Sequence, residues 1–242
     1  MKRLLAVALF ALAVPASVSG GTPLTVLAAA SLTQVFPRID KAPRYSFAGS
    51  DQLAVQLQQG APADVFAAAS PKQTQLLYRS GLVRRPVVFA TNKLIVLLPR
   101  ANPGRIRDVY DLRRTGLKLV IGDSGVPIGV YTRKLLDTIG IAEEVLRNVV
   151  SEETDVKGIV AKVALGEADA GFVYATDVRP VRSRTRTVAL PAWAQPPIRY
   201  EIAVVKSTDR PVAAQGFVKK VQSKRARILL KNAGFGLPAP QK

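Results

Sequence analysis

The feature that most constrains the fold is a repeated unit in which an apolar strand, a turn of small residues and a helix follow one another. Its first copy joins the apolar run Leu24–Leu27 to the small residues Ala28–Ala30 and then to Ser31. A second copy leads from Tyr45–Ala48 into a predicted helix that begins near Ser50. Strands and helices alternate in this way along most of the chain. The pattern predicts an α/β protein with largely parallel sheets.

Two more copies of the unit lie in the second half of the chain. Leu117–Ile121 is followed by a turn and a predicted helix start at Ile128, and Asn148–Val150 is followed by Asp155 and Val156. The first turn of any helix carries N–H groups without a partner inside the helix, and its dipole favours an anion. If these helix starts converge, they therefore predict an anion-binding site.

The order of the elements predicts two lobes joined by two crossings. The strand–helix rhythm restarts after Leu98, and a strand near Arg199 returns to the first lobe. Ligands of such sheets bind beyond the carboxyl ends of the strands, here in the cleft between the lobes, and closure of the cleft is a hinge motion. The predicted segments are a signal peptide (1–21), lobe 1 (22–98), lobe 2 (99–198), and a return to lobe 1 with a C-terminal helix (199–242).

The N-terminus has the three parts of an export signal. Met1-Lys2-Arg3 is positively charged, Leu4–Val14 is apolar, and Ala16–Gly21 offers small residues for cleavage. The chain has no cysteine, so no residue at the cleavage site can carry a lipid. We therefore expect a soluble periplasmic protein without a lipid anchor.

Composition narrows the chemistry further. The absence of His and Cys excludes most zinc sites and Ser-His-Asp triads, which argues against an enzyme. Asp51, Asp123 and Asp155 are expected to cap helices, with no direct metal ligands among them. The net charge of +18 comes from scattered Lys and Arg without interleaved aromatic residues, which favours a solvated basic surface over nucleic-acid binding.

Five residues form the predicted site, and all of them supply neutral donors. Ser31 and Ser50 offer a hydroxyl and an N–H, Ile128 and Val156 offer only an N–H, and Tyr174 offers a phenol at a strand end. A fully deprotonated tetrahedral oxyanion accepts at every oxygen, whereas the hydrogen of a protonated phosphate would stay unpaired, at a cost of roughly 1–3 kcal/mol. In the competing interpretation, Ser50 is a helix cap and Val156 and Tyr174 are core residues.

The sequence resembles the periplasmic molybdate-binding proteins of ABC transporters from Leu24 to Phe235. The matching segments keep the family's order and are Leu24–Leu32, Phe47–Ser50, Gly60–Phe66, Gly122–Tyr131, Thr154–Val156 and Gly171–Asp177. One departure from the family's pattern is Ile128, which stands where the family commonly has Ala. Its larger side chain can narrow the rim of the binding site while leaving the backbone N–H unchanged.

The resemblance implies a two-lobed periplasmic binding protein of the Venus-flytrap type, with a mostly parallel sheet flanked by helices in each lobe. It implies that molybdate, and tungstate too, is bound through Ser31, Ser50, Ile128, Val156 and Tyr174. It also implies delivery to a membrane permease and its ATPase. We expect a monomer that needs no cofactor and binds no nucleic acid.

Three alternatives remain open from sequence alone. A sulfate carrier would bind an ion of the same charge and shape with shorter bonds. An enzyme that acts on anionic substrates would have to work without His and Cys. A ligand-sensing domain of a DNA-binding regulator would not need the export signal, and no helix-turn-helix segment precedes the first strand.

Overall fold

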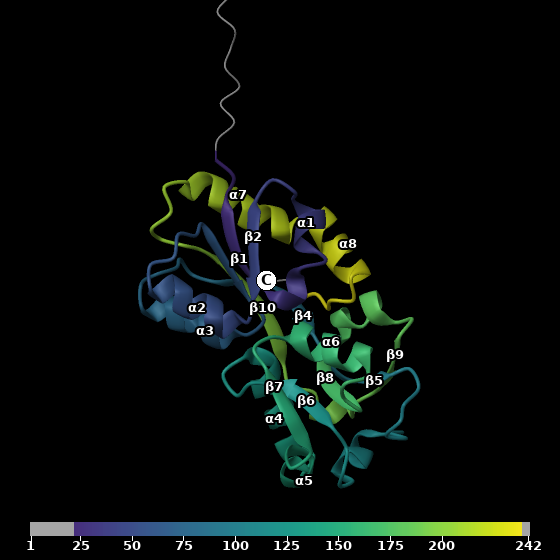
Figure 1. The fold of residues 1–242 in the computed structure, drawn as a ribbon. Coiled ribbons are helices and arrows are strands. Elements are labelled where there is room, and N and C mark those ends of the chain that lie inside the picture. Colours follow the sequence, from purple (N-terminus) through teal and green to yellow (C-terminus); the bar gives the residue numbers. More distant parts are fainter. Residues whose placement is uncertain (1–21, 239–242) are drawn as a thin grey trace, which may run out of the picture.

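The computed structural model describes residues 22–238, which form two lobes, each built on a five-stranded sheet (Figure 1). The predicted signal peptide, residues 1–21, lies outside the described residues. The lobe 1 sheet has the order β2-β1-β3-β10-β4 and consists of β1 (Thr25–Ala29), β2 (Arg44–Ala48), β3 (Val65–Ala68), β4 (Val87–Asn92) and β10 (Ile198–Val204). The lobe 2 sheet has the order β7-β6-β8-β5-β9 and consists of β5 (Leu94–Pro99), β6 (Leu119–Gly122), β7 (Val149–Glu153), β8 (Ala170–Tyr174) and β9 (Thr185–Val188).

Helices cover both faces of the lobe 1 sheet. These helices are α1 (Phe36–Ile39), α2 (Ser50–Gln58), α3 (Pro71–Arg79), α7 (Pro211–Gln222) and α8 (Lys224–Asn232). Successive residues of a strand face opposite sides, so Leu27 packs with Leu53 and Leu77 under α2 and α3, whereas Val26 belongs to the core on the other face. That second core contains Phe36 of α1 and Phe217 of α7, whose ring centroids are 5.9 Å apart.

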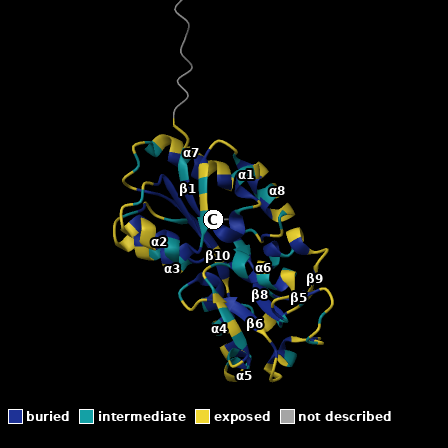
Figure 2. Cartoon of the chain, in the orientation of Figure 1, coloured by how far each residue is buried: buried dark blue, intermediate teal, exposed yellow. Residues whose placement is uncertain are grey.

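Lobe 2 carries α4 (Pro127–Thr138), α5 (Ala142–Leu146) and α6 (Val156–Leu165). The strands of both lobes are largely buried between their helices, and the buried zone continues from one lobe into the other (Figure 2). Within the described part of the chain, no helix is both long enough and apolar enough to cross a membrane.

The two-lobed α/β architecture is confirmed, but the sheets are mixed. In each sheet three neighbouring strands are parallel, namely β2-β1-β3 and β7-β6-β8. β10 runs antiparallel to β3 and β4, and β5 runs antiparallel to β8 and β9. The reason lies in the crossings. β5 and β10 each follow a crossing and therefore begin at the hinge. The three parallel strands of each sheet end at the hinge, so β5 and β10 run in the opposite direction.

The first crossing lies earlier than the predicted boundary after Leu98. That boundary falls inside β5, which pairs with β8 and β9 in lobe 2, so the chain changes lobe at Lys93, between β4 and β5. The sequence of an apolar run such as Leu94–Leu98 does not indicate which of the two sheets contains the strand. The second crossing connects β9 to β10, and its Gln195 side chain binds the N–H and C=O of Leu94, each at 2.9 Å.

Several local predictions differ from the structure. Ser31 does not cap an α-helix, because Ala30–Leu32 forms a single 3-10 turn that begins after Ala29. Pro37 lies in the first turn of the four-residue helix α1, where a proline is tolerated, so it marks the start of a helix and does not interrupt one. The C-terminal helix is divided at Ser223, which caps α8 by accepting the N–H of Ala226 at 3.2 Å.

Candidate oxyanion-binding site

All five residues predicted for the site line one small cavity between the lobes. Lobe 1 contributes Ser31 and Ser50, and lobe 2 contributes Ile128, Val156 and Tyr174. The cavity has a volume of about 20 Å³. This is far below the roughly 300 Å³ or more of sites for organic ligands, so the cavity in this conformation suits a small ion.

Strand register explains the lobe 1 side of the cavity. β1 and β2 are parallel, and Ala29 pairs with Ala48, so the residues that follow both strands emerge at the same edge. Ser31 and Ser50 therefore lie on one wall. The rest of that wall is made of small residues, which are Ala29, Ala30, Ala48, Gly49 and Ala69. Small side chains let a guest approach the backbone closely.

The lobe 2 side has the same construction. β6 and β7 are parallel, with Gly122 paired to Glu153, and each runs into a helix start. Pro127 occupies the first turn of α4, where it needs no N–H partner. The predicted cap of α6 is confirmed: the Asp155 carboxylate accepts the N–H groups of Lys157 at 2.6 Å and Gly158 at 3.3 Å.

The backbone N–H groups at these helix starts are available to a ligand. Within residues 22–238, no side chain or loop carbonyl accepts the N–H of Ser31, Ser50, Ile128 or Val156. Each stands in the first turn of its helix, where no preceding carbonyl of the same helix can reach it. Four unpartnered donors thus belong to the residues that line one cavity.

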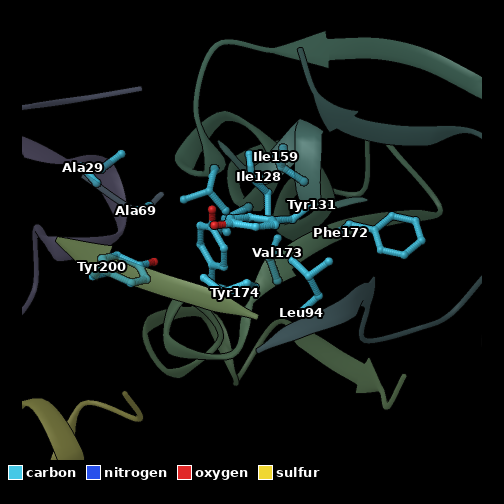
Figure 3. Close-up of a cluster of buried hydrophobic side chains, with 14 of the residues drawn as sticks. Ala29, Ala69, Leu94, Ile128, Tyr131, Ile159, Phe172, Val173, Tyr174 and Tyr200 are labelled. Atoms are coloured by element: carbon cyan, nitrogen blue, oxygen red, sulfur yellow. The ribbon is translucent and has the colours of Figure 1, made fainter. Parts of the chain in front are cut away.

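Tyr174 adds a hydroxyl that is buried and unpartnered. Its side chain is 2 % exposed, and its oxygen has no hydrogen-bond partner in the described chain. Burial raises the pKa of Tyr174 well above its ordinary value, so the O–H keeps its proton at physiological pH. Figure 3 shows its ring among the side chains of Tyr131, Tyr200 and Ile128, and its centroid is 6.0 Å from that of Tyr200. A buried donor without a partner is uncommon in native proteins and calls for an explanation such as a missing ligand.

The two serine hydroxyls are oriented by neighbours that sequence reasoning missed. Ser50 Oγ accepts the N–H of Ala69 at 3.1 Å, which frees its hydrogen for the cavity. Ser31 Oγ lies 2.8 Å from the Tyr200 hydroxyl, and Asn92 Nδ2 donates to Tyr200 at 3.2 Å. Tyr200 can then donate to Ser31, whose own hydrogen is free as well.

The orientation of Asn92 is fixed on its other side. Its Oδ1 accepts the N–H of Lys93 at 2.9 Å, so its Nδ2 must be the atom that donates to Tyr200 and, at 3.0 Å, to Thr176. Asn92 is the last residue of β4, before the first crossing, and Tyr200 is the third residue of β10, after the second. The nearness of both residues to the hinge is the only signal that could have pointed to them.

Among the lining residues that the structure describes, none is a cation. The one charged residue among them is Asp155, an acceptor that the sequence-based count of donors did not include. The nearby Lys157 is engaged with Asp177, with Nζ 2.6 Å from Oδ1. Burial raises the pKa of Asp177, and Lys157 opposes that shift. Residues 22–238 contain no group of three or more acidic side chains placed to hold a metal ion.

The lobes touch at the rim of the cavity. A Cβ placed on Gly49 of lobe 1 would lie 2.4 Å from the Thr154 carbonyl oxygen of lobe 2 and 2.8 Å from Asp51 Oδ1. Real Cβ atoms do not approach other atoms so closely, so this contact requires glycine. The structure is therefore closed around the cavity, with the backbones of the two lobes adjacent.

Comparison with known proteins places this geometry in a family. Residues 24–236 match the model of the family described as bacterial extracellular solute-binding protein. The molybdate-binding protein ModA of Mycobacterium tuberculosis is 38% identical over 229 residues, which cover 90% of this chain and 86% of that protein.

Solved structures share the fold. The periplasmic molybdate-binding protein of Azotobacter vinelandii superposes with a TM-score of 0.79 at 24% identity, covering 89% of this chain and 100% of that one. The sulfate-binding protein SubI of Mycobacterium tuberculosis also gives a TM-score of 0.79, at 17% identity, covering 91% and 88%. These two likenesses establish the fold alone. The match over residues 24–236 and the 38% identity go further: this chain belongs to the family of bacterial extracellular solute-binding proteins and is a relative of the molybdate-binding proteins.

Proposed function

We propose that this chain is a periplasmic solute-binding protein that captures molybdate, and tungstate as well, between its lobes and delivers the ion to an ABC importer. The family match and the molybdate-binding relative support the class of protein and the ligand. In this proposal the chain performs no chemical conversion. It binds the ion, closes its lobes around it and releases it to the importer.

The observation that carries the proposal is the buried Tyr174 hydroxyl, which has no partner within residues 22–238, together with four N–H groups that have none there either. A buried donor that stays unpaired costs about 1–3 kcal/mol. A ligand that only accepts hydrogen bonds removes this cost at every position. A fully deprotonated tetrahedral dianion such as molybdate is such a ligand.

Each of the five residues has a role in this proposal. Ser31 and Ser50 donate through hydroxyl and N–H, Ile128 and Val156 donate through N–H alone, and Tyr174 donates through its phenol. The dipoles of α2, α4 and α6 add partial positive charge at their first turns. Fixed neutral donors can replace the hydration shell of the ion without a buried counter-charge, whose own desolvation would be costly.

Closure couples capture to transport. Because donors come from both lobes, the ion is fully coordinated only when the lobes close. A permease can then distinguish the closed, loaded form from the open, empty form. Release follows when the lobes separate and Ser31 and Ser50 move away from the three lobe 2 donors.

Isothermal titration calorimetry of the purified protein with molybdate, tungstate, sulfate and phosphate tests the proposal. We expect one molybdate or tungstate per chain, bound at least about tenfold more tightly than sulfate, which is a difference of about 1.4 kcal/mol or more. Phosphate is expected to bind less tightly than molybdate, because among the described lining residues only the Asp155 carboxylate could accept the hydrogen that phosphate carries near neutral pH. Sulfate binding as tight as molybdate binding would instead identify a general oxyanion or sulfate carrier.

A further inference from the structure

A second and larger cavity shares Ser31 with the oxyanion cavity. We call it the arginine groove. Its volume is about 310 Å³, and its lining comes from lobe 1, lobe 2 and the segment after α8. This volume lies at the lower end of the range, about 300–1,000 Å³, that holds small organic ligands. The groove is therefore large enough for a small organic molecule.

Three arginines line the groove, one from lobe 1 and two from lobe 2. They are Arg38 of α1, and Arg179 and Arg182 in the segment between β8 and β9. All three side chains are exposed, and none forms an ion pair with a carboxylate of residues 22–238. No Asp or Glu lies among the lining residues that the structure describes. The groove therefore presents positive charge that nothing in its lining neutralises.

The lining of the groove also includes the buried hydroxyl of Thr176. Thr176 is 8% exposed, and its Oγ1 accepts the Asn92 amide at 3.0 Å, which leaves its own hydrogen available to a guest. Arg179 donates through one nitrogen to the Asn232 carbonyl at 2.9 Å. This bond anchors Arg179 against the end of α8, and the other nitrogens of its guanidinium face no recorded partner in the described chain.

We infer that the arginine groove is a second anion-binding site, specific for a small molecule with two or more phosphate or carboxylate groups. Guanidinium groups bind both kinds of group with paired hydrogen bonds. Because Arg38 and Arg182 belong to different lobes, one polyvalent guest can contact both lobes at once. This inference does not depend on the ligand of the smaller cavity.

Another surface groove with three arginines serves as an internal comparison. It is lined by Arg105, Arg107 and Arg186, has a volume of about 530 Å³, and consists of lobe 2 residues alone. It shares no residue with the oxyanion cavity. Arg186 is exposed on β9, so the variant Arg186→Gln removes an equivalent charge outside the proposed site.

The test is calorimetric titration of the molybdate-saturated protein with inorganic pyrophosphate and, separately, with citrate. The two probes distinguish phosphate from carboxylate chemistry. We expect at least one of them to bind with one site per chain. Binding should weaken at least tenfold in the double variant Arg38→Gln/Arg182→Gln and less than twofold in Arg186→Gln. Raising the salt from about 20 mM to about 200 mM should weaken binding severalfold, because exposed charges are screened.

Three results would overturn the inference. Neither probe binds, or both Arg38→Gln/Arg182→Gln and Arg186→Gln bind the probe like the unaltered chain, or the probe displaces molybdate instead of binding beside it. Molybdate titration of the double variant serves as the folding control. An affinity within twofold of that of the unaltered chain shows that the lobes still close.

Discussion

The oxyanion cavity and the arginine groove share the lining residue Ser31, but the groups with which they would bind an anion differ. The cavity is small, lies between the two lobes, and is lined among the described residues by neutral donors and one carboxylate. The groove is more than ten times larger and presents three exposed arginines. Inside a closed cleft, fixed dipoles act at full strength and no cation has to be desolvated. Around the exposed arginines water weakens every dipole, so full charges are needed to attract an anion over a useful distance.

This difference explains how a chain with a net charge of +18 can have a central site without a cation in its lining. The proposed oxyanion site depends on geometry, which the backbone fixes. The proposed second site depends on charge, which salt can screen. Anion binding in the two cavities should therefore respond differently to changes in backbone geometry and to changes in charge.

The largest effect is expected from preventing closure of the oxyanion cavity alone. In Gly49→Ala the new methyl would collide with the Thr154 carbonyl oxygen of the opposite lobe, so the cleft cannot close fully. We expect molybdate affinity to fall by about 100-fold, or about 2.8 kcal/mol, measured by calorimetry.

Gly216→Ala is the matched control for this change. A Cβ on Gly216 meets no atom within 4 Å, and the residue lies in α7, far from the cleft in sequence and fold. Alanine in a helix stabilises by roughly 0.5–1 kcal/mol relative to glycine, so this variant should melt slightly higher and bind molybdate normally. Equal loss of affinity in both variants would contradict the account of closure.

The next largest effect separates binding from stability. Tyr174→Phe removes one donor to a charged ligand and should weaken molybdate binding by roughly 1–2 kcal/mol. Because the hydroxyl has no partner in the described chain, its removal should leave the melting temperature of the ligand-free protein unchanged or raised. An unchanged dissociation constant would mean that Tyr174 is only a core residue.

Tyr200→Phe provides the contrast for Tyr174→Phe. Its hydroxyl is bonded to Ser31 and Asn92, so its loss should lower the melting temperature as well as the affinity. If the two tyrosine variants behaved alike in both measurements, the distinction between a ligand-facing and a network-forming hydroxyl would fail.

A smaller effect of opposite sign is expected at Asp155. Asn caps helices as well as Asp does, so Asp155→Asn should preserve α6 while removing the one negative charge among the described residues that line the cavity. Molybdate binding should tighten, by about threefold for a partly solvated charge. Weaker binding in this variant, with the helix content unchanged by circular dichroism, would assign Asp155 a direct part in binding.

The smallest effect is expected from pH. Burial raises the pKa of Tyr174 well above its ordinary value, and a group with a raised pKa keeps its proton until the pH rises through that value. The phenol therefore remains a donor across the neutral range, and the other proposed donors do not titrate there. Molybdate affinity should change by less than about twofold between about pH 6 and about pH 9. A tenfold loss in that interval, seen in parallel titrations, would require a titrating group in the site.

Much of the site could be predicted because it is built from local signals. Small residues after a strand, a helix start near Ile128 and Asp155 at a cap are all signals that involve immediate neighbours in the sequence. Parallel register then brings the turns together, as the pairing of Ala29 with Ala48 shows. A recurring local unit was thus enough to name residues that share one cavity.

What the sequence did not reveal depends on contacts between distant segments. Tyr200 meets Ser31 across 169 positions, and only the return of β10 into the lobe 1 sheet places them together. β5 was assigned to the wrong lobe because the sequence of an apolar strand does not indicate the strands with which it pairs. The arginine groove escaped notice for the same reason, since Arg38 and Arg182 become neighbours only in the fold.

The most direct test of the account is a crystal structure of the molybdate complex, with the ion located by the anomalous scattering of molybdenum. We predict one strong peak in the oxyanion cavity. The ion's oxygens should lie about 2.7–3.2 Å from the donors of Ser31, Ser50, Ile128, Val156 and Tyr174. A principal peak among Arg38, Arg179 and Arg182, with none in the oxyanion cavity, would contradict the claim that neutral donors hold the ion.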